Sequence, residues 1–186
     1  MIKLLQVDAS GNVPYPEAHH PTLSKLRGLK VIGGSSLAGK FPDLSLILQD
    51  GYECPRGSVD YFRVGLLNVV SARLRDVFVS VGAETEFFPV SVYYHGRVLQ
   101  NHYFAANFLI RVRAIDMSKS DVELNDELGD ALSVRQLVLD ESVLKGVRVA
   151  VIDEINSLAV DPTTAEAILS AGCIGCALVD PPSFKY

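Results

Sequence analysis

The stretch that decides the fold is His102-Tyr-Phe-Ala-Ala-Asn-Phe-Leu-Ile-Arg-Val-Arg-Ala-Ile115. Its second half alternates apolar residues with arginines. The apolar positions are Phe108, Ile110, Val112 and Ala114, and Arg111 and Arg113 stand between them. An alternation with a period of two residues is typical of a strand that buries one face. We therefore predict a strand over residues 102–115, with the apolar side chains facing a core and the arginines facing away from it.

Further strands are expected on both sides of this stretch. Apolar or valine-rich runs predict them over residues 29–32, 44–48, 86–94, 133–139 and 147–152. His95-Gly96 is typical of a tight turn after the third of these strands.

Two helices are also expected. Ser71 is a candidate N-cap residue for the first, which buries an apolar face and ends at Gly82. The second begins at Thr163 or Thr164 and ends at Gly172. Strand and helix do not alternate regularly along the chain, which argues against a doubly wound sheet.

The predicted fold is therefore α+β, with a mostly antiparallel sheet, a few packed helices and a loop-rich N-terminal part. The first 57 residues are rich in glycine and proline, whereas longer patterned segments follow. We expect residues 1–57 to form a loop-rich segment or small subdomain and residues 58–186 to form the main domain. The two parts are expected to pack as one compact unit.

Composition excludes several classes of function. The chain has 186 residues, with 17 basic and 22 acidic side chains and a formal net charge of −5. This charge argues against a nucleic-acid-binding surface, which normally carries a basic excess. No apolar run is long enough for a secretory signal or a membrane span. The three cysteines, Cys54, Cys173 and Cys176, are too few and odd in number for a disulfide framework. We expect a cytoplasmic protein without a membrane partner.

One stretch comes close to a phosphate-binding loop. Gly34-Ser-Ser-Leu-Ala-Gly39-Lys40 matches the first seven positions of that motif. Phe41, however, stands where a serine or threonine would bind magnesium, and a strand rather than a helix is expected to follow. A glycine-rich turn is the favoured interpretation over a nucleotide site.

The cysteines and histidines offer little further chemistry. Cys173-Ile-Gly-Cys176 has the spacing of a redox pair or half a zinc site, but it follows a helix end and lacks two further zinc ligands. Packing of small buried thiols is the favoured interpretation. The histidines, His19, His20, His95 and His102, have no neighbouring base or nucleophile in the sequence. We therefore expect no catalytic, metal-binding or cofactor-binding residues.

An acidic run is the most informative charge feature. Five carboxylates fall within ten residues with no basic residue among them. They are Asp121, Glu123, Asp126, Glu127 and Asp130. Such a run is a solvated loop, a solvated helix face or a landing site for a basic partner. These five residues are the candidate partner-binding residues.

Four ordered stretches carry a resemblance to a known family. They are Val69-Val-Ser-Ala-Arg-Leu-Arg-Asp76, Glu84-Thr-Glu-Phe-Phe-Pro-Val90, Tyr103-Phe-Ala-Ala-Asn-Phe-Leu-Ile-Arg-Val-Arg-Ala-Ile-Asp-Met-Ser-Lys-Ser120 and Leu169-Ser-Ala-Gly-Cys-Ile-Gly175. Together they cover roughly residues 58–179. This part of the chain resembles a bacterial immunity-protein family of polymorphic toxin systems, formerly a domain of unknown function. The first 57 residues carry no such resemblance.

The resemblance implies a non-enzymatic protein that binds and neutralises a cognate secreted toxin, encoded by the adjacent gene. It supplies no catalytic residues. Two alternatives stay open: an enzyme with a spatially assembled site, and a protein–protein adaptor module. A homodimer also stays open.

Overall fold

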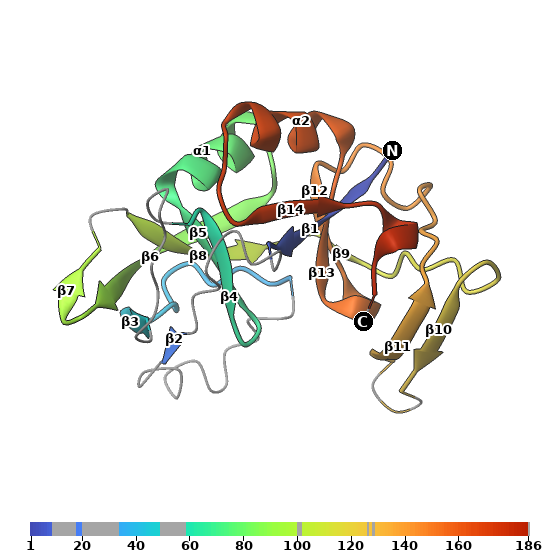
Figure 1. Ribbon diagram of the computed structural model, residues 1–186, viewed down its shortest axis with the longest axis horizontal. Helices are drawn as coiled ribbons and strands as arrows, with labels where there is room; N and C mark the ends of the chain where they lie inside the picture. Colours follow the sequence, from blue (N-terminus) through green and yellow to red (C-terminus); the bar gives the residue numbers. More distant parts are fainter. Residues whose placement is uncertain are drawn as a thin grey trace.

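The computed structural model describes residues 1–8, 18–19, 34–48, 59–99, 102–125, 127 and 129–185. Strands dominate, and two α-helices lie together on one side of them (Figure 1). The strands are β1 Lys3–Val7, β2 Ala18–His19, β3 Leu44–Leu48, β4 Tyr61–Val64, β5 Leu67–Ser71, β6 Thr85–Tyr94, β7 Arg97–Val98, β8 Tyr103–Phe108, β9 Arg111–Val112, β10 Asp121–Leu124, β11 Ala131–Gln136, β12 Val149–Ile152, β13 Ser157–Val160 and β14 Cys176–Val179. The helices are α1 Ala72–Ser80 and α2 Pro162–Ser170, with short 3-10 turns η2 Asp153–Ile155 and η3 Pro181–Ser183.

Within the described residues the strands form two large sheets and one hairpin. The first sheet has the order β14-β1-β13-β12-β9. The second has the order β2-β3-β6-β8-β5-β4, with β7 also paired to β6. The hairpin is β10-β11. Strand β1 lies between β13 and β14, so the start of the chain is paired with its last third.

Both large sheets are mixed. Most of their pairings are antiparallel, but β12 pairs with β9 in parallel and β3 pairs with β6 in parallel. The predicted α+β fold is therefore confirmed in outline. The prediction of a mostly antiparallel sheet is corrected, because both large sheets are mixed. The parallel pairs arise because long connections bring β3 beside β6 and β9 beside β12.

The stretch 102–115 is not one strand. Its first part, β8, lies between β5 and β6, whereas β9 joins the other sheet beside β12. The break falls at Leu109, whose N–H donates to the Glu84 carbonyl at 3.0 Å, and at Ile110, whose carbonyl accepts from Val151 N–H at 3.0 Å. Phe108 consequently packs in a different core cluster from Ile110 and Val112, so the predicted shared face is wrong.

Helix α1 follows the prediction closely. The Ser71 hydroxyl accepts from Leu74 N–H at 3.3 Å, and Leu74, Val77 and Phe78 are buried. Gly82 lies just beyond the helix with a φ of +74°, a backbone conformation that glycine adopts without a steric cost.

Helix α2 begins earlier than predicted. Its N-cap residue is Asp161, whose carboxylate accepts from Thr164 N–H at 2.8 Å, and Pro162 occupies the first helical position. Thr163 and Thr164 therefore lie inside the helix, because proline is well suited to the first turn. The end at Gly172 is confirmed by its φ of +63°.

The two sheets share a core beneath the helices. One hydrophobic cluster joins Leu74 and Phe78 of α1, Ile168 of α2, Val151 of the first sheet and Phe108 of the second. The helices lie over this cluster at the top of Figure 1. Within the described residues no helix is long and apolar enough to cross a membrane. The division at residue 57 stays a prediction.

Candidate partner-binding face

The acidic run forms a β-hairpin, not the loop that was expected. Residues 121–124 pair with residues 131–136, and the turn between them is held by two backbone hydrogen bonds. Asn125 N–H donates to the Asp130 carbonyl, and Gly129 N–H donates to the Asn125 carbonyl, both at 2.8 Å. Gly129 has a φ of +73°, which lets the chain reverse direction here.

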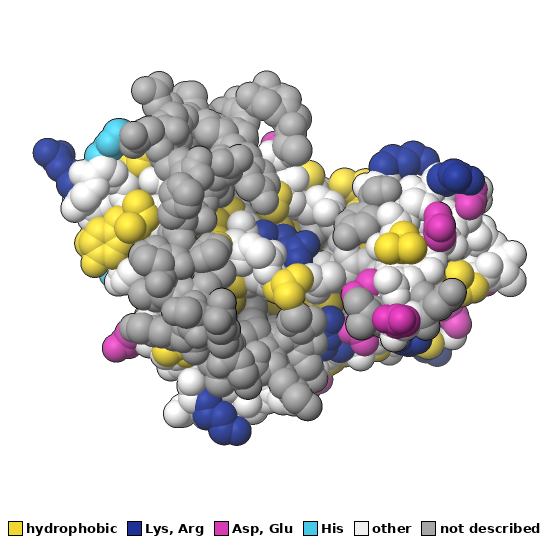
Figure 2. Space-filling view, turned by 90° about the horizontal axis from the view of Figure 1, so that it is seen from below, with side chains coloured by type: hydrophobic (Ala, Val, Ile, Leu, Met, Phe, Trp, Pro, Cys, Tyr) yellow, Lys and Arg dark blue, Asp and Glu magenta, His cyan; other side chains and the backbone are white. Residues whose placement is uncertain are grey.

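Four of the five candidate carboxylates are exposed on this hairpin. They are Asp121, Glu123, Glu127 and Asp130, whereas Asp126 lies outside the described residues. Acidic side chains gather on this part of the molecule, at the right of Figure 2. Asp121 lies 3.7 Å from Arg135, an exposed pair that contributes at most about 1 kcal/mol. The carboxylates therefore remain accessible to a partner.

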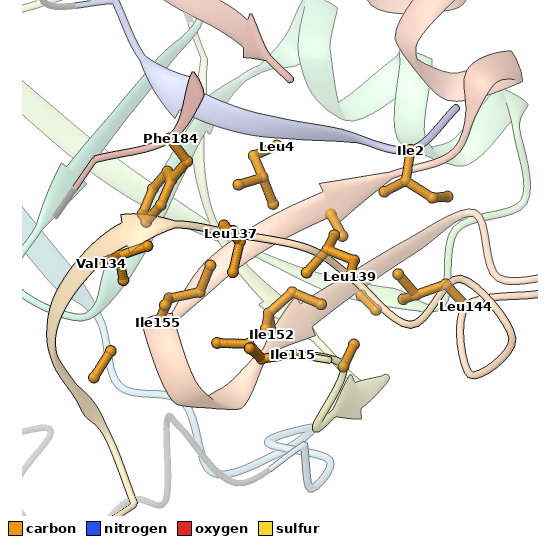
Figure 3. Packing of buried hydrophobic residues seen from close by; sticks show 14 residues of the cluster. Ile2, Leu4, Ile115, Val134, Leu137, Leu139, Leu144, Ile152, Ile155 and Phe184 are labelled. Carbon is orange, nitrogen blue, oxygen red and sulfur yellow. The ribbon is translucent and has the colours of Figure 1, made fainter. Parts of the chain in front are cut away.

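The opposite side of the hairpin is buried. Val134 and Ala131 belong to a hydrophobic cluster that includes Leu4, Ile152 and Phe184, so the first sheet and the C-terminal segment support the hairpin (Figure 3). The acidic side chains thus stand on a strand pair anchored to the core. Leu132, which is 57% exposed, adds an apolar side chain to the outward surface.

A cleft of about 500 Å³ adjoins the hairpin turn. It lies where the two large sheets meet, and Figure 2 shows basic side chains in the hollow between the two parts of the molecule. Its lining residues come from β4 and the turn after it, from β9 and the residue after it, from the hairpin turn and the first residue of β11, and from η2 and the residue after it. They are Arg63, Leu66, Arg111, Arg113, Gly129, Asp130, Ala131, Asp153, Glu154, Ile155 and Asn156.

The charges in this cleft are only partly paired. Arg111 donates to Asp153 at 2.7 Å, and its side chain is largely buried. Among the described residues that line the cleft, two buried side-chain atoms have no hydrogen-bond partner: Arg63 Nε and Glu154 Oε2. Glu154 is only 7% exposed, so its unpartnered oxygen carries a desolvation cost. Both atoms are inaccessible to solvent, whereas Arg113 and Asp130 are exposed and offer charged groups to a ligand.

The hairpin turn and the cleft form one continuous surface. A Cβ atom built on Gly129 would lie 2.6 Å from Arg113 Nη2, which shows how closely the turn approaches this arginine. Asp130 belongs to both the acidic run and the lining of the cleft. We call the exposed hairpin carboxylates together with the cleft the hairpin–cleft face.

Comparison with known families identifies the chain. The sequence model of the Immunity protein family (Imm11) matches residues 13–180. The chain belongs to this family. The match confirms the resemblance and extends it into the first 57 residues, where none was expected. No curated protein matches the chain.

The near-match to a phosphate-binding loop has a structural role in this family member. Leu37 N–H donates to Glu86 Oε2 at 2.8 Å, and Ser36 and Asn107 bind the same carboxylate. Partial burial opposes ionisation of Glu86, but these hydrogen bonds outweigh it and lower its pKa. The strand β3 follows Lys40, as expected, where a nucleotide site would need a helix.

The remaining candidates are scattered. His95 lies in the β6–β7 turn and His102 is exposed before β8, whereas the His19 side chain, His20 and Cys54 lie outside the described features. Cys173 lies just after α2, and Cys176 is the first residue of β14. Both thiols pack against the core cluster beneath the helices, as predicted, but they are half-buried. Among the described residues no three His, Cys, Asp or Glu side chains group as metal ligands.

Sequence reasoning missed the cleft. Arg63 and Glu154 lie about ninety positions apart, and nothing in their neighbourhoods marks either as functional. Arg111 and Arg113 were placed on the non-core face of a strand, which is the only sequence signal that pointed toward this surface.

Proposed function

We propose that this chain is a non-enzymatic immunity protein that binds and neutralises a cognate toxin in the cytoplasm of the producing bacterium. Membership of the immunity protein family over residues 13–180 carries this proposal. The toxin is the product of the adjacent gene, as in polymorphic toxin systems. Protection follows from occlusion of the toxin's active site or of a surface beside it.

The hairpin–cleft face is the proposed contact surface. Its exposed carboxylates repel one another, and Lys or Arg side chains of a partner would relieve that repulsion. Charges of this kind mainly raise the association rate, because they steer an oppositely charged partner before contact. This supports a toxin with a basic surface around its active site.

The cleft beside the hairpin supplies the second part of the contact. Arg113 lines the cleft and is exposed, so its guanidinium can donate to a carbonyl or carboxylate oxygen of the toxin. A charge-assisted hydrogen bond of this kind favours a slow dissociation rate, whereas the hairpin favours fast association.

Co-expression with the adjacent gene tests the function. The toxin alone should arrest growth of the host, and co-expression of this chain should restore growth and yield a complex that survives purification. An adjacent product that is harmless alone, or a toxin that kills equally with and without this chain, contradicts the proposal. Stoichiometric zinc by elemental analysis, or nucleotide binding that disappears with Lys40→Ala, would favour the enzyme alternative.

A further inference from the structure

The turn between α2 and β14 holds two cysteines on a fixed backbone. Gly172 comes directly before Cys173 and has a φ of +63°. Gly175 comes directly before Cys176 and has a φ of +81°. A Cβ atom on Gly175 would lie 3.1 Å from the Val59 Cβ atom, so the turn packs closely against the start of β4. The Cys-x-x-Cys pair therefore lies on a turn whose conformation is fixed by its contacts with the segment that begins β4.

A buried carboxylate holds this turn at its centre. Ile174 N–H donates to Asp60 Oδ2 at 2.7 Å, and Asp60 N–H donates to the Ile174 carbonyl at 2.7 Å. Asp8 N–H donates to the Gly175 carbonyl at 3.0 Å. Arg73 Nη1 donates to the Gly172 carbonyl at 3.3 Å. Both peptide groups of Ile174 and the carbonyl of Gly175 are thus fixed between the two cysteines.

The thiols meet on this preorganised turn. Cys173 and Cys176 pack against the same hydrophobic cluster, and both are free and half-buried, so a small reagent reaches them. Each thiol also lies close enough to shift the pKa of the other. We propose that Cys173 and Cys176 form a reversible intramolecular disulfide in exchange with low-molecular-weight disulfides such as glutathione disulfide. This modification is independent of the proposed toxin-binding function.

The exchange has two balanced steps. The Cys173 thiolate attacks one sulfur of glutathione disulfide, which forms a mixed disulfide and releases one glutathione thiolate. Cys176 then loses its proton to solvent and attacks the Cys173 sulfur, which releases the second glutathione. The two cysteines lose two electrons and two protons in total, and the glutathione disulfide is reduced to two thiols.

The local electrostatics assign the order of attack. The hydrogen bond from the Cys176 thiol, together with the nearby Arg73 guanidinium, lowers the pKa of Cys173 despite burial and the Asp60 carboxylate. The hydrogen bond to Cys173, burial and the carboxylates of Asp60 and Asp8 raise the pKa of Cys176. A thiolate and not a thiol is the nucleophile, and the Arg73 guanidinium lies beside Cys173, 3.3 Å from the Gly172 carbonyl. Cys173 is therefore the attacking residue and Cys176 the resolving one.

Equilibration of the full chain in glutathione buffers tests this proposal. The Cys54→Ser variant isolates the pair, provided that its circular dichroism matches the wild-type protein. After incubation at several ratios of oxidised to reduced glutathione, free thiols are alkylated and the intact protein is weighed by mass spectrometry. We expect a species lighter by two hydrogens that carries no alkyl group, and its full conversion back after addition of dithiothreitol.

Two further variants keep the outcome decisive. Adding Cys176→Ser should trap a stable glutathione adduct at Cys173, because the resolving thiol is gone. Adding Cys173→Ser should slow adduct formation by about tenfold or more, because the lower-pKa thiol has been removed. The proposal is overturned if both cysteines alkylate fully at every ratio, if glutathione stays attached to Cys173 while Cys176 is intact, or if the wild-type protein pairs either cysteine with Cys54.

Discussion

Replacement of Asp60 by asparagine tests whether a buried carboxylate joins α1 to the turn between α2 and β14. Asp60 is 2% exposed. Its carboxylate accepts from Ser71 Oγ at 2.5 Å, from Ile174 N–H at 2.7 Å and from Arg73 Nη1 at 3.4 Å. Ser71 is also the N-cap residue of α1, so this one side chain connects three segments of the chain.

The expected loss of stability follows from the number of hydrogen-bond acceptors that the new side chain offers. An asparagine amide has one oxygen and an NH₂ group, so it cannot accept from both Ser71 and Ile174. Whichever way the amide is turned, one buried donor loses its acceptor, at a cost of about 1–3 kcal/mol. A central value of about 2 kcal/mol corresponds to a fall in Tm of roughly 4–8 °C for a chain of this length.

Thermal unfolding followed by circular dichroism, with urea unfolding at 25 °C, measures the effect. The matched control is Asp76→Asn on α1, because Asp76 has a 65% exposed side chain and pairs with its neighbour Arg75. The control should change the free energy of unfolding by less than about 0.5 kcal/mol. If Asp60→Asn unfolds within the same margin of the wild-type protein, the carboxylate does not join these segments energetically.

Three further predictions concern single carboxylates. Glu86→Gln should weaken the attachment of the loop at Leu37 by about 1–2 kcal/mol, seen as roughly tenfold faster amide exchange there by mass spectrometry, and unchanged exchange would contradict it. Asp161→Ala should lower Tm by about 2–4 °C through loss of the α2 N-cap. Asp161→Asn should retain most of the stability, because asparagine also caps helices. Equal losses for the two variants would refute the capping role. Hydrogen bonds from Lys119 and Ser118 lower the pKa of Asp116 from 3.8 to about 2 in the folded protein, so its stabilising contribution is present above pH 3.8 and is lost as the pH falls toward 2. Asp116→Asn should therefore flatten the pH dependence of urea unfolding between pH 4 and pH 2, and an unaltered slope would show that this pKa shift does not stabilise the fold.

Local signals in the sequence predicted local structure well. The N-cap bond of Ser71, the helical spacing behind it and the reversal at Gly82 all act within a few residues, so α1 was correctly predicted. His95 and Gly96 both have positive φ values, as a tight turn between β6 and β7 requires. The error at α2 was avoidable, since Asp161-Pro162 is itself a strong start signal.

Features set by distant partners were not predictable in the same way. The break at Leu109 depends on Glu84 and on β12, so the alternation over residues 102–115 gave no sign that the chain changes sheets there. The four described carboxylates of the acidic run are exposed, as predicted. Its strand was missed because acidic residues disfavour strands, although Val122 and Leu124 alternate with them. The cleft joins residues from four separate segments and has no local signature.

The association kinetics of the purified toxin with two charge variants of this chain test the central claim most directly. The hairpin variant replaces Asp121, Glu123, Glu127 and Asp130 by Asn or Gln. The control variant makes the same kind of change at four exposed carboxylates outside the hairpin, namely Asp76, Glu84, Glu141 and Glu166. Both variants change the formal net charge equally, so they separate a local contact from a general charge effect.

Surface plasmon resonance at low and high salt gives the decisive comparison. We predict that the hairpin variant associates more slowly than the control and shows a flatter dependence on ionic strength, while both keep nearly the wild-type Tm. Where a replaced carboxylate would have lost water on binding, the replacement should cost about 2 kcal/mol or more of binding free energy. This corresponds to a loss of affinity of roughly thirtyfold. Equal association rates and equal salt dependence for the two variants would contradict the claim that the hairpin–cleft face binds the toxin.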